Sequence, residues 1–216
     1  FATQNRLVTR EDYIIRTYSM PAKFGSVAKA YIVPDDQILQ QDQVEKRVPN
    51  PLAMNMYVLG YNANKQLVAL NQAIKENLKT YLNHYRILTD AVNIKDAFII
   101  NIGVNFEITV LPNYNSNEVL LKCVSSLKDY FNIDRWQVNQ PIIKSAITNI
   151  IGNVQGVQTV VAATVRNIYN SDNGYSGNVY DLAPATRNGI IYPSLDPSIF
   201  EVKYPNQDIR GRVVSS

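Results

Sequence analysis

The chain has 216 residues, of which 46% are hydrophobic and 18% are charged, a composition typical of a folded globular protein. The formal net charge is only +3 and no run of Lys or Arg occurs, so a nucleic-acid partner is not expected. A single Cys excludes an internal disulfide framework, and no apolar run reaches the roughly 18 residues of a membrane span. The sequence opens FATQNRLVTRED, without Met or the pattern of a signal peptide, so we expect a fragment or a processed product.

A short helix and its lead-in are predicted over residues 1–24. Thr9 and Asp12 have the spacing of a capping box, and the acidic Glu11 and Asp12 suit the positive end of a helix. Met20-Pro21 should end this helix. We interpret the two acids as helix-start residues rather than as a catalytic pair.

A first α+β half is predicted over residues 25–97. A strand is expected over Ser26–Val33, and a second one over Leu52–Tyr61, where apolar residues alternate. Between them, residues 36–50 are polar and Gln-rich, and we interpret them as a long excursion or loose hairpin.

The same half should contain a helix and a further short strand. Asn71 is a good N-cap residue, and apolar side chains follow it at helical spacing: Ile74, Leu78, Tyr81, Leu82 and Tyr85. His84, the only histidine, lies near the end of this helix, and we interpret it as a surface or capping residue rather than a catalyst. Residues 88–97 should carry a short strand.

A second α+β half, over residues 98–169, should be organised around a long strand from Ala97 to Leu111. Every second residue from Ile100 to Val110 is apolar, which indicates a strand with one face in a core. The residues between them are Asn101, Gly103, Asn105, Glu107 and Thr109. This other face should meet water, the chain's own C-terminal region or another subunit.

An amphipathic helix is predicted from Ser116 to Phe131, with Asn115 and Glu118 at capping-box spacing. Cys123 lies within its apolar face, so we interpret it as a small core residue rather than as a nucleophile.

A fourth helix should begin near Pro141 and end at Gly152, and Gly156-Val157 should open a last strand that runs toward Tyr169. The repeated order of strand, helix and strand suggests two related halves. The fold class predicted from these patterns is α+β, a two-layer module of sheet and helices.

Residues 170–216 are predicted to form an extended C-terminal arm. Four prolines (Pro184, Pro193, Pro197 and Pro205) prevent a long helix. The arm also carries apolar anchors that must be buried on its own domain or on a neighbour, and these are the candidate interface residues: Ile191, Tyr192, Ile199, Phe200, Val202 and Tyr204.

Motifs for catalysis and cofactor binding are missing. One Cys and one His cannot build a usual zinc site, and no GxxxxGK, GxGxxG or GxSxG motif occurs. We therefore expect no enzyme, no metal, no cofactor and no small-molecule substrate. Tyr is over-represented, with 14 copies, and this residue type is enriched at interfaces, although core or sheet-surface positions are the simpler interpretation.

The order of elements resembles the J-like baseplate module of contractile-tail phages. The opening RLVTREDYIIRTYSMPAKFGSVAKAYIV is similar to its first helix and short strand. The family pattern Y-R-x-L-T-D-x-V is matched between Tyr85 and Val92, and its G-V before a last strand is matched by Gly156 and Val157. The resemblance covers residues 6–169.

The arm sequence NGIIYPSLDPSIFEVKYPNQDIRGRV resembles the C-terminal end of the larger baseplate wedge subunit of T-even-type phages. The resemblance implies a structural protein of the virion tail, assembled in the host cytoplasm, that forms a homodimer and contacts other wedge subunits in the ring around the hub. It implies no catalytic residues. An alternative from composition alone is a polymer-binding module for a host-surface glycan or nucleic acid, with exposed Tyr as stacking platforms.

Overall fold

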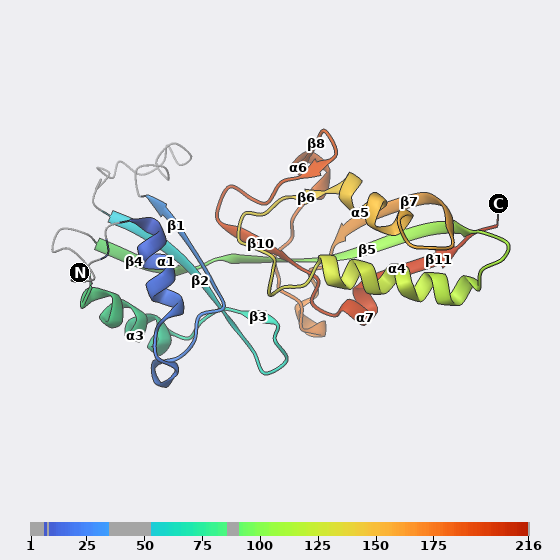
Figure 1. Ribbon diagram of the computed structural model, residues 1–216. Coiled ribbons are helices and arrows are strands. Elements are labelled where there is room, and N and C mark those ends of the chain that lie inside the picture. Colours follow the sequence, from blue (N-terminus) through green and yellow to red (C-terminus); the bar gives the residue numbers. More distant parts are fainter. Residues whose placement is uncertain (1–6, 8, 35–52, 86–90, 216) are drawn as a thin grey trace, which may run out of the picture. The chain divides into compact units, whose positions relative to one another are not determined.

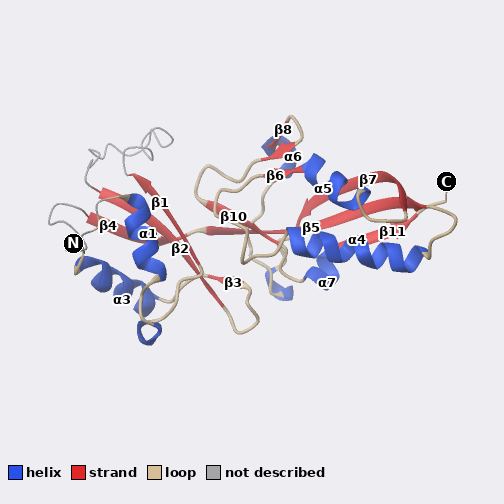
Figure 2. Cartoon of the chain, in the orientation of Figure 1, coloured by secondary structure: helices blue, strands red, loops and turns tan. Residues whose placement is uncertain are grey.

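The computed structural model describes residues 7, 9–34, 53–85 and 91–215. The chain divides into two compact units, Phe1–Ala97 and Phe98–Ser216, here called unit 1 and unit 2. Helices and mixed sheets occur in both (Figures 1 and 2), which confirms the predicted α+β class. The predicted excursion over residues 36–50 lies outside the described residues.

Unit 1 is built on a sheet whose central strand is β2. This strand pairs antiparallel with β1 and β3, and parallel with β4. The strand bounds are Lys29–Pro34 for β1, Ala53–Tyr61 for β2, Leu67–Val68 for β3 and Ala91–Asp96 for β4. β1 begins three residues later than the sequence predicts, because its register with β2 starts at the pair Lys29 and Leu59.

In the described part of unit 1 the helices are α1 (Arg10–Tyr18) and α3 (Gln72–Asn83), with the 3-10 turn η1 (Ala22–Phe24) between them in the chain. The predicted capping box of α1 is confirmed: the Thr9 N–H donates to Asp12 Oδ2 at 2.8 Å, and the Asp12 N–H donates to Thr9 Oγ1 at 3.2 Å. Both helices pack over the apolar side of the sheet, where Met56 and Val58 are fully buried.

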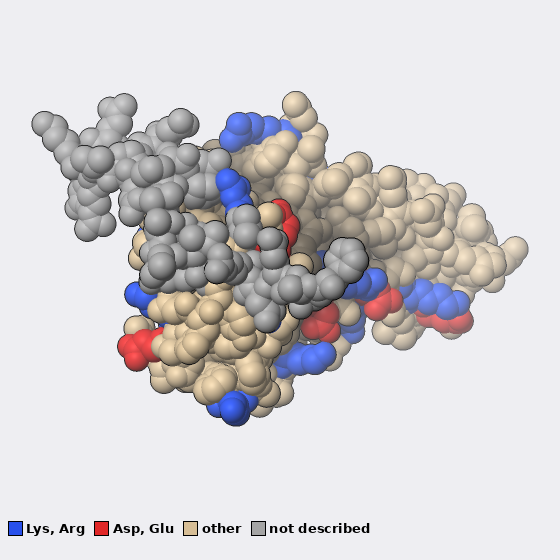
Figure 3. All heavy atoms as spheres, turned by 60° about the vertical axis from the view of Figure 1, so that its left-hand side comes forward, with Lys and Arg blue, Asp and Glu red and all other residues tan. Residues whose placement is uncertain are grey.

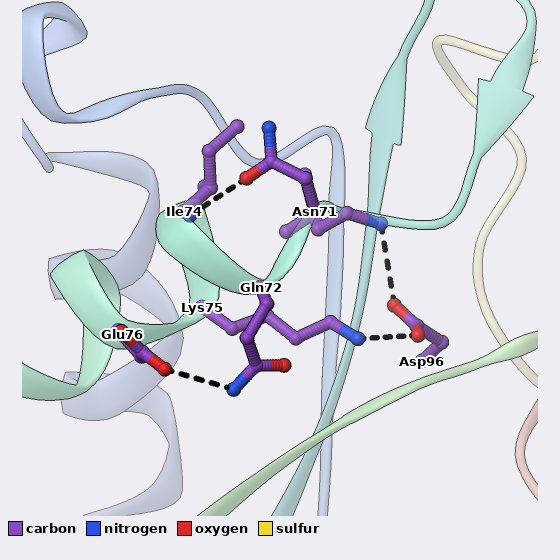
Figure 4. Close-up of polar contacts among 7 residues, drawn as sticks. Asn71, Gln72, Ile74, Lys75, Glu76 and Asp96 are labelled. Carbon is purple, nitrogen blue, oxygen red and sulfur yellow. Dashed lines mark hydrogen bonds and ion pairs between the residues drawn. The ribbon is translucent and has the colours of Figure 1, made fainter.

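The start of α3 is fixed by polar contacts to the end of β4 (Figure 4). Asn71 is the N-cap, as predicted, and its Oδ1 accepts from the Ile74 N–H at 2.8 Å. The Asp96 carboxylate accepts from the Leu70 N–H at 3.2 Å and forms an ion pair with Lys75. Helix and strand are therefore held in one relative position at this corner.

Unit 2 is a sheet with helices on one face. Its central strand β5 (Phe98–Val110) pairs antiparallel with β7 (Val157–Asn167) on one side. Along its other side it pairs in parallel first with β10 (Ser198–Glu201) and then with β11 (Ile209–Val213). Helix α4 (Ser116–Tyr130) packs on β11, and α5 (Lys144–Gly152) packs on β7 and α4 (Figure 1).

Smaller elements complete unit 2. A short three-stranded sheet has β9 at its centre, between β6 and β8. The bounds are Ile142–Ile143 for β6, Thr186–Arg187 for β8 and Ile190–Ile191 for β9; Ser171–Asn173 for η2, Leu182–Ala185 for α6 and Pro205–Asp208 for α7. The predicted helix start at Pro141 is wrong, because Ile142 and Ile143 pair with β9 and α5 begins only at Lys144.

The alternation of β5 is confirmed on its apolar face, where every second residue from Ile100 to Ile108 is buried. The opposite face is not uniformly exposed to solvent. Asn105 is exposed, but Asn101 and Thr109 are buried. The first half of this face is covered by residues of the C-terminal arm, which is one of the alternatives that the sequence leaves open.

Candidate functional site: surfaces of unit 2

The C-terminal arm completes the sheet of its own unit. Phe98 donates its N–H to the Pro197 carbonyl, and the Val214 N–H donates to the Ile108 carbonyl. Even-numbered residues of β5 therefore bond toward the arm, while the Ile168 N–H donates to the Asn101 carbonyl on the opposite side. β10 and β11 thus act as one interrupted strand beside β5, with α7 as the interruption.

The structure places most of the predicted interface residues of the arm in the interior of unit 2. The buried ones are Ile191, Ile199, Phe200 and Val202. Tyr192 is 40% exposed, with its ring 5.6 Å from the Arg187 guanidinium, and Tyr204 is half-buried. Only the two tyrosines of this set offer surface to a partner in this fold, so an interface role for the set stays a prediction.

A hydrogen-bond network covers the polar face of β5 around Asn101. The Asn101 Nδ2 donates to Glu201 Oε2 at 2.8 Å, and its Oδ1 accepts from the Ser176 N–H at 2.7 Å. Ser176 Oγ and Asn178 Nδ2 both donate to the Ile99 carbonyl, at 2.7 and 2.9 Å. These contacts hold the segment after η2 across the strand, which is a structural task rather than a chemical one.

A second buried polar cluster centres on Asp208, at the end of α7. One carboxylate oxygen accepts from the Tyr175 hydroxyl at 2.6 Å and the other from the Tyr204 N–H at 2.8 Å. Burial of the Tyr175 hydroxyl, followed by its hydrogen bond to Asp208 and the charge of that carboxylate, raises the pKa of Tyr175 to about 12. The phenol therefore stays protonated at neutral pH and continues to donate.

The predicted non-catalytic residues occupy structural positions. His84 is the C-cap of α3, with its ring Nδ1 2.7 Å from the Thr80 carbonyl. Cys123 is buried in α4, and burial raises the pKa of its thiol to about 11, so the reactive thiolate is scarce at neutral pH. Among the described residues, no group of His, Cys, Asp and Glu could hold a metal ion, and no helix there is long and apolar enough to cross a bilayer.

The structure also shows a surface that the sequence analysis did not identify. The chain carries no charged residue between Lys144 and Arg166, and this stretch forms nearly all of α5 and β7, which pack together. On the right of Figure 3 the charged side chains lie along the lower margin, and the surface above them is uncharged. Val161 is 53% exposed within this stretch. We call the exposed part of residues 145–165 the neutral surface. The absence of charged residues over this stretch is visible in the sequence and could have indicated the surface.

Charge depletion is a feature of the central part of protein interfaces. The neutral surface therefore fits a contact with another protein better than contact with water alone.

The fold has a solved counterpart. A chain of the cryo-EM structure of the anti-feeding prophage (AFP) baseplate, 6-fold symmetrised, is similar to this one with a TM-score of 0.54 and 11% identity.

That similarity covers 93% of this chain and 39% of the baseplate chain. The present chain therefore spans well under half of its counterpart's length, and the likeness at this identity shows a shared fold. No protein-family model matches the sequence, and no curated protein matches it.

Proposed function

We propose that this chain is a structural component of a contractile-tail baseplate and acts through contacts between proteins. The observation that carries the proposal is the fold, which is shared over 93% of this chain with a chain of the anti-feeding prophage baseplate. The order of sequence motifs, which resembles the J-like baseplate module, supports the same role independently of the three-dimensional comparison.

The neutral surface and the cis-packed arm are consistent with this role. The chain's polar clusters around Asn101 and Asp208 hold segments of unit 2 together, so they serve rigidity. Within the role, we propose a wedge subunit in the virion tail that binds a second copy of itself and other wedge subunits. An obligate interface of this class buries on the order of 2,000 Å² or more.

The test is to find the protein in tail particles. We expect contractile tails purified from the source organism to contain the protein in a fixed ratio to the other baseplate proteins, measured by quantitative mass spectrometry. Antibody-gold labelling should mark the baseplate end of the tail. Purified tails that lack the protein, or labelling along the sheath alone, would contradict the proposal.

A further inference from the structure

The outer edge of β7 is a long strand edge without a partner strand in the described part of the chain, where β7 pairs with β5 alone. Because the Ile168 N–H donates to the Asn101 carbonyl, backbone groups along this part of β7 alternate between β5 and the outside. The backbone N–H and C=O groups of Thr164 and Arg166 point toward β5, and those of Ala163 and Val165 point outward. Near Asn167 the edge is covered, since the Asn167 side chain accepts from the Tyr180 N–H at 2.9 Å.

Strand edges that must stay single are usually protected by charged side chains, proline or irregular geometry, because an open edge is a template for another strand. β7 has no charged residue and no proline from Val157 to Val165. Its irregularities are two register shifts against β5, one between Glu107 and Ile108 and one between Thr109 and Val110. The sequence of the strand is rich in Val and Thr, which favour extended pairing.

The other edge strand of this sheet differs in this respect. β11 carries Arg210 and Arg212, and Arg212 forms an ion pair with Glu107, with Nη2 2.5 Å from Oε1. Two copies that met along β11 would bring these arginines close to their own symmetry mates. Like charges placed directly opposite one another in a sheet are destabilising.

We propose that β7 of one copy pairs antiparallel with β7 of a second copy, so that the two sheets continue across a twofold axis. This inference rests on the proposed structural role and names the surface through which the chain self-associates. A twofold contact brings each residue near its own symmetry mate, and a neutral strand can do this without opposing like charges. α5, which packs beside β7, adds further uncharged surface to the contact.

The pairing also fixes which residue lies at the centre. Residues 158–165 lie before the covered end at Asn167, so a strand that pairs with itself over this range has Val161, which lies at one of the two register shifts, close to the axis. Over residues 158–165 the strand spans about 26 Å at ~3.3 Å per residue.

The experiment measures self-association of the full chain by sedimentation equilibrium. We expect the wild-type chain to be a dimer at micromolar concentration. Val161→Lys and Val161→Glu should each raise the dimer dissociation constant at least ten-fold, since each opposes like charges. An equimolar mixture of the two variants should regain dimers. Leu121→Lys is the matched control, because Leu121 is 69% exposed on α4, and it should leave the constant unchanged.

A backbone variant tests the pairing itself. Ala163→Pro removes an outward N–H and no bond to β5, so the chain should keep its circular dichroism spectrum and lose the dimer. A monomeric wild type, or dimers that survive both Val161 charges and Ala163→Pro, would overturn the inference. If these variants stay dimeric but lose a different baseplate protein, the second copy is the wrong occupant. The proposed function is judged separately, by the presence of the protein in tails.

Discussion

The Tyr175 hydroxyl donates a 2.6 Å hydrogen bond to Oδ1 of the buried Asp208 carboxylate. The two residues are 33 positions apart in the chain. Asp208 ends α7 and Tyr175 follows η2, so this bond joins α7 to the segment after η2. The Tyr175 and Tyr204 rings also meet edge to face, with centroids 5.2 Å apart. The bond should therefore contribute measurably to the stability of unit 2.

We expect Tyr175→Phe to lower the free energy of unfolding by about 1–3 kcal/mol, because it leaves a buried carboxylate short of a donor. The pKa of Tyr175 is raised from 10.0 to about 12. The stabilisation that the Tyr175–Asp208 hydrogen bond gives the folded state is therefore complete below pH 10 and is lost as the pH rises through about 12. Between pH 8 and pH 11.5, the urea unfolding midpoint should fall more in wild type than in Tyr175→Phe. Equal losses in both proteins would contradict this assignment.

The two faces of β5 can be distinguished by placing an Asp at each of two neighbouring positions in turn. Val104 is fully buried on the apolar face and Asn105 is exposed on the other. Val104→Asp should cost at least about 3 kcal/mol, since an unpaired charge would be buried. Asn105→Asp should change stability by less than about 0.5 kcal/mol. Thermal unfolding compares the two, and similar melting temperatures would show that the faces are wrongly assigned.

The packing around β11 leaves no room for a side chain at Gly211. A Cβ at this position would lie 2.3 Å from Phe106 Cζ and 2.7 Å from Leu120 Cδ1. Gly211→Ala should therefore destabilise the protein by about 1–3 kcal/mol through overpacking. A Cβ at Gly177 would meet no atom within 4 Å, so Gly177→Ala is the matched control and should be nearly neutral. Chemical denaturation measures both, and an equally neutral Gly211→Ala would show that β11 can move away from β5.

Phe200 tests whether the arm is part of the core. Its side chain is 2% exposed and lies near the Tyr180 ring, with centroids 6.2 Å apart. Phe200→Ala should cost about 3–5 kcal/mol, as for other buried aromatic residues. Tyr192→Ala should cost less than about 1 kcal/mol, because the ring is partly exposed and its contact with Arg187 lies at the surface. A Phe200→Ala chain with wild-type stability in its monomeric form would mean that the arm packs elsewhere.

Local patterns allowed much of the fold to be predicted. The capping residues Thr9 and Asn71 were identified because a cap depends on side chains within three positions. The period of two from Ile100 to Val110 identified β5 for the same reason. The start of α5 was misplaced, since Pro141 has the properties of a first helical residue, whereas Ile142 and Ile143 pair with β9.

The candidate sites were less accessible to sequence reasoning. Apolar anchors such as Ile199 and Phe200 must be buried, but the sequence does not say on which molecule. The structure pairs them with β5, about 100 residues earlier, and such distant pairing leaves no local pattern. The neutral surface was visible as a stretch without charges, but its meaning depends on α5 and β7 lying together at a sheet edge.

The sequence by itself determined the α+β class, the central strand and the capped helices, because periodicity and capping are properties of neighbouring residues. Only the tertiary structure decided where the arm lies and which faces remain available. Half of the polar face of β5 is covered by the arm's own hydrogen bonds around Asn101. The open edge of β7 exists because β5 has only two sides, and the arm occupies the other one.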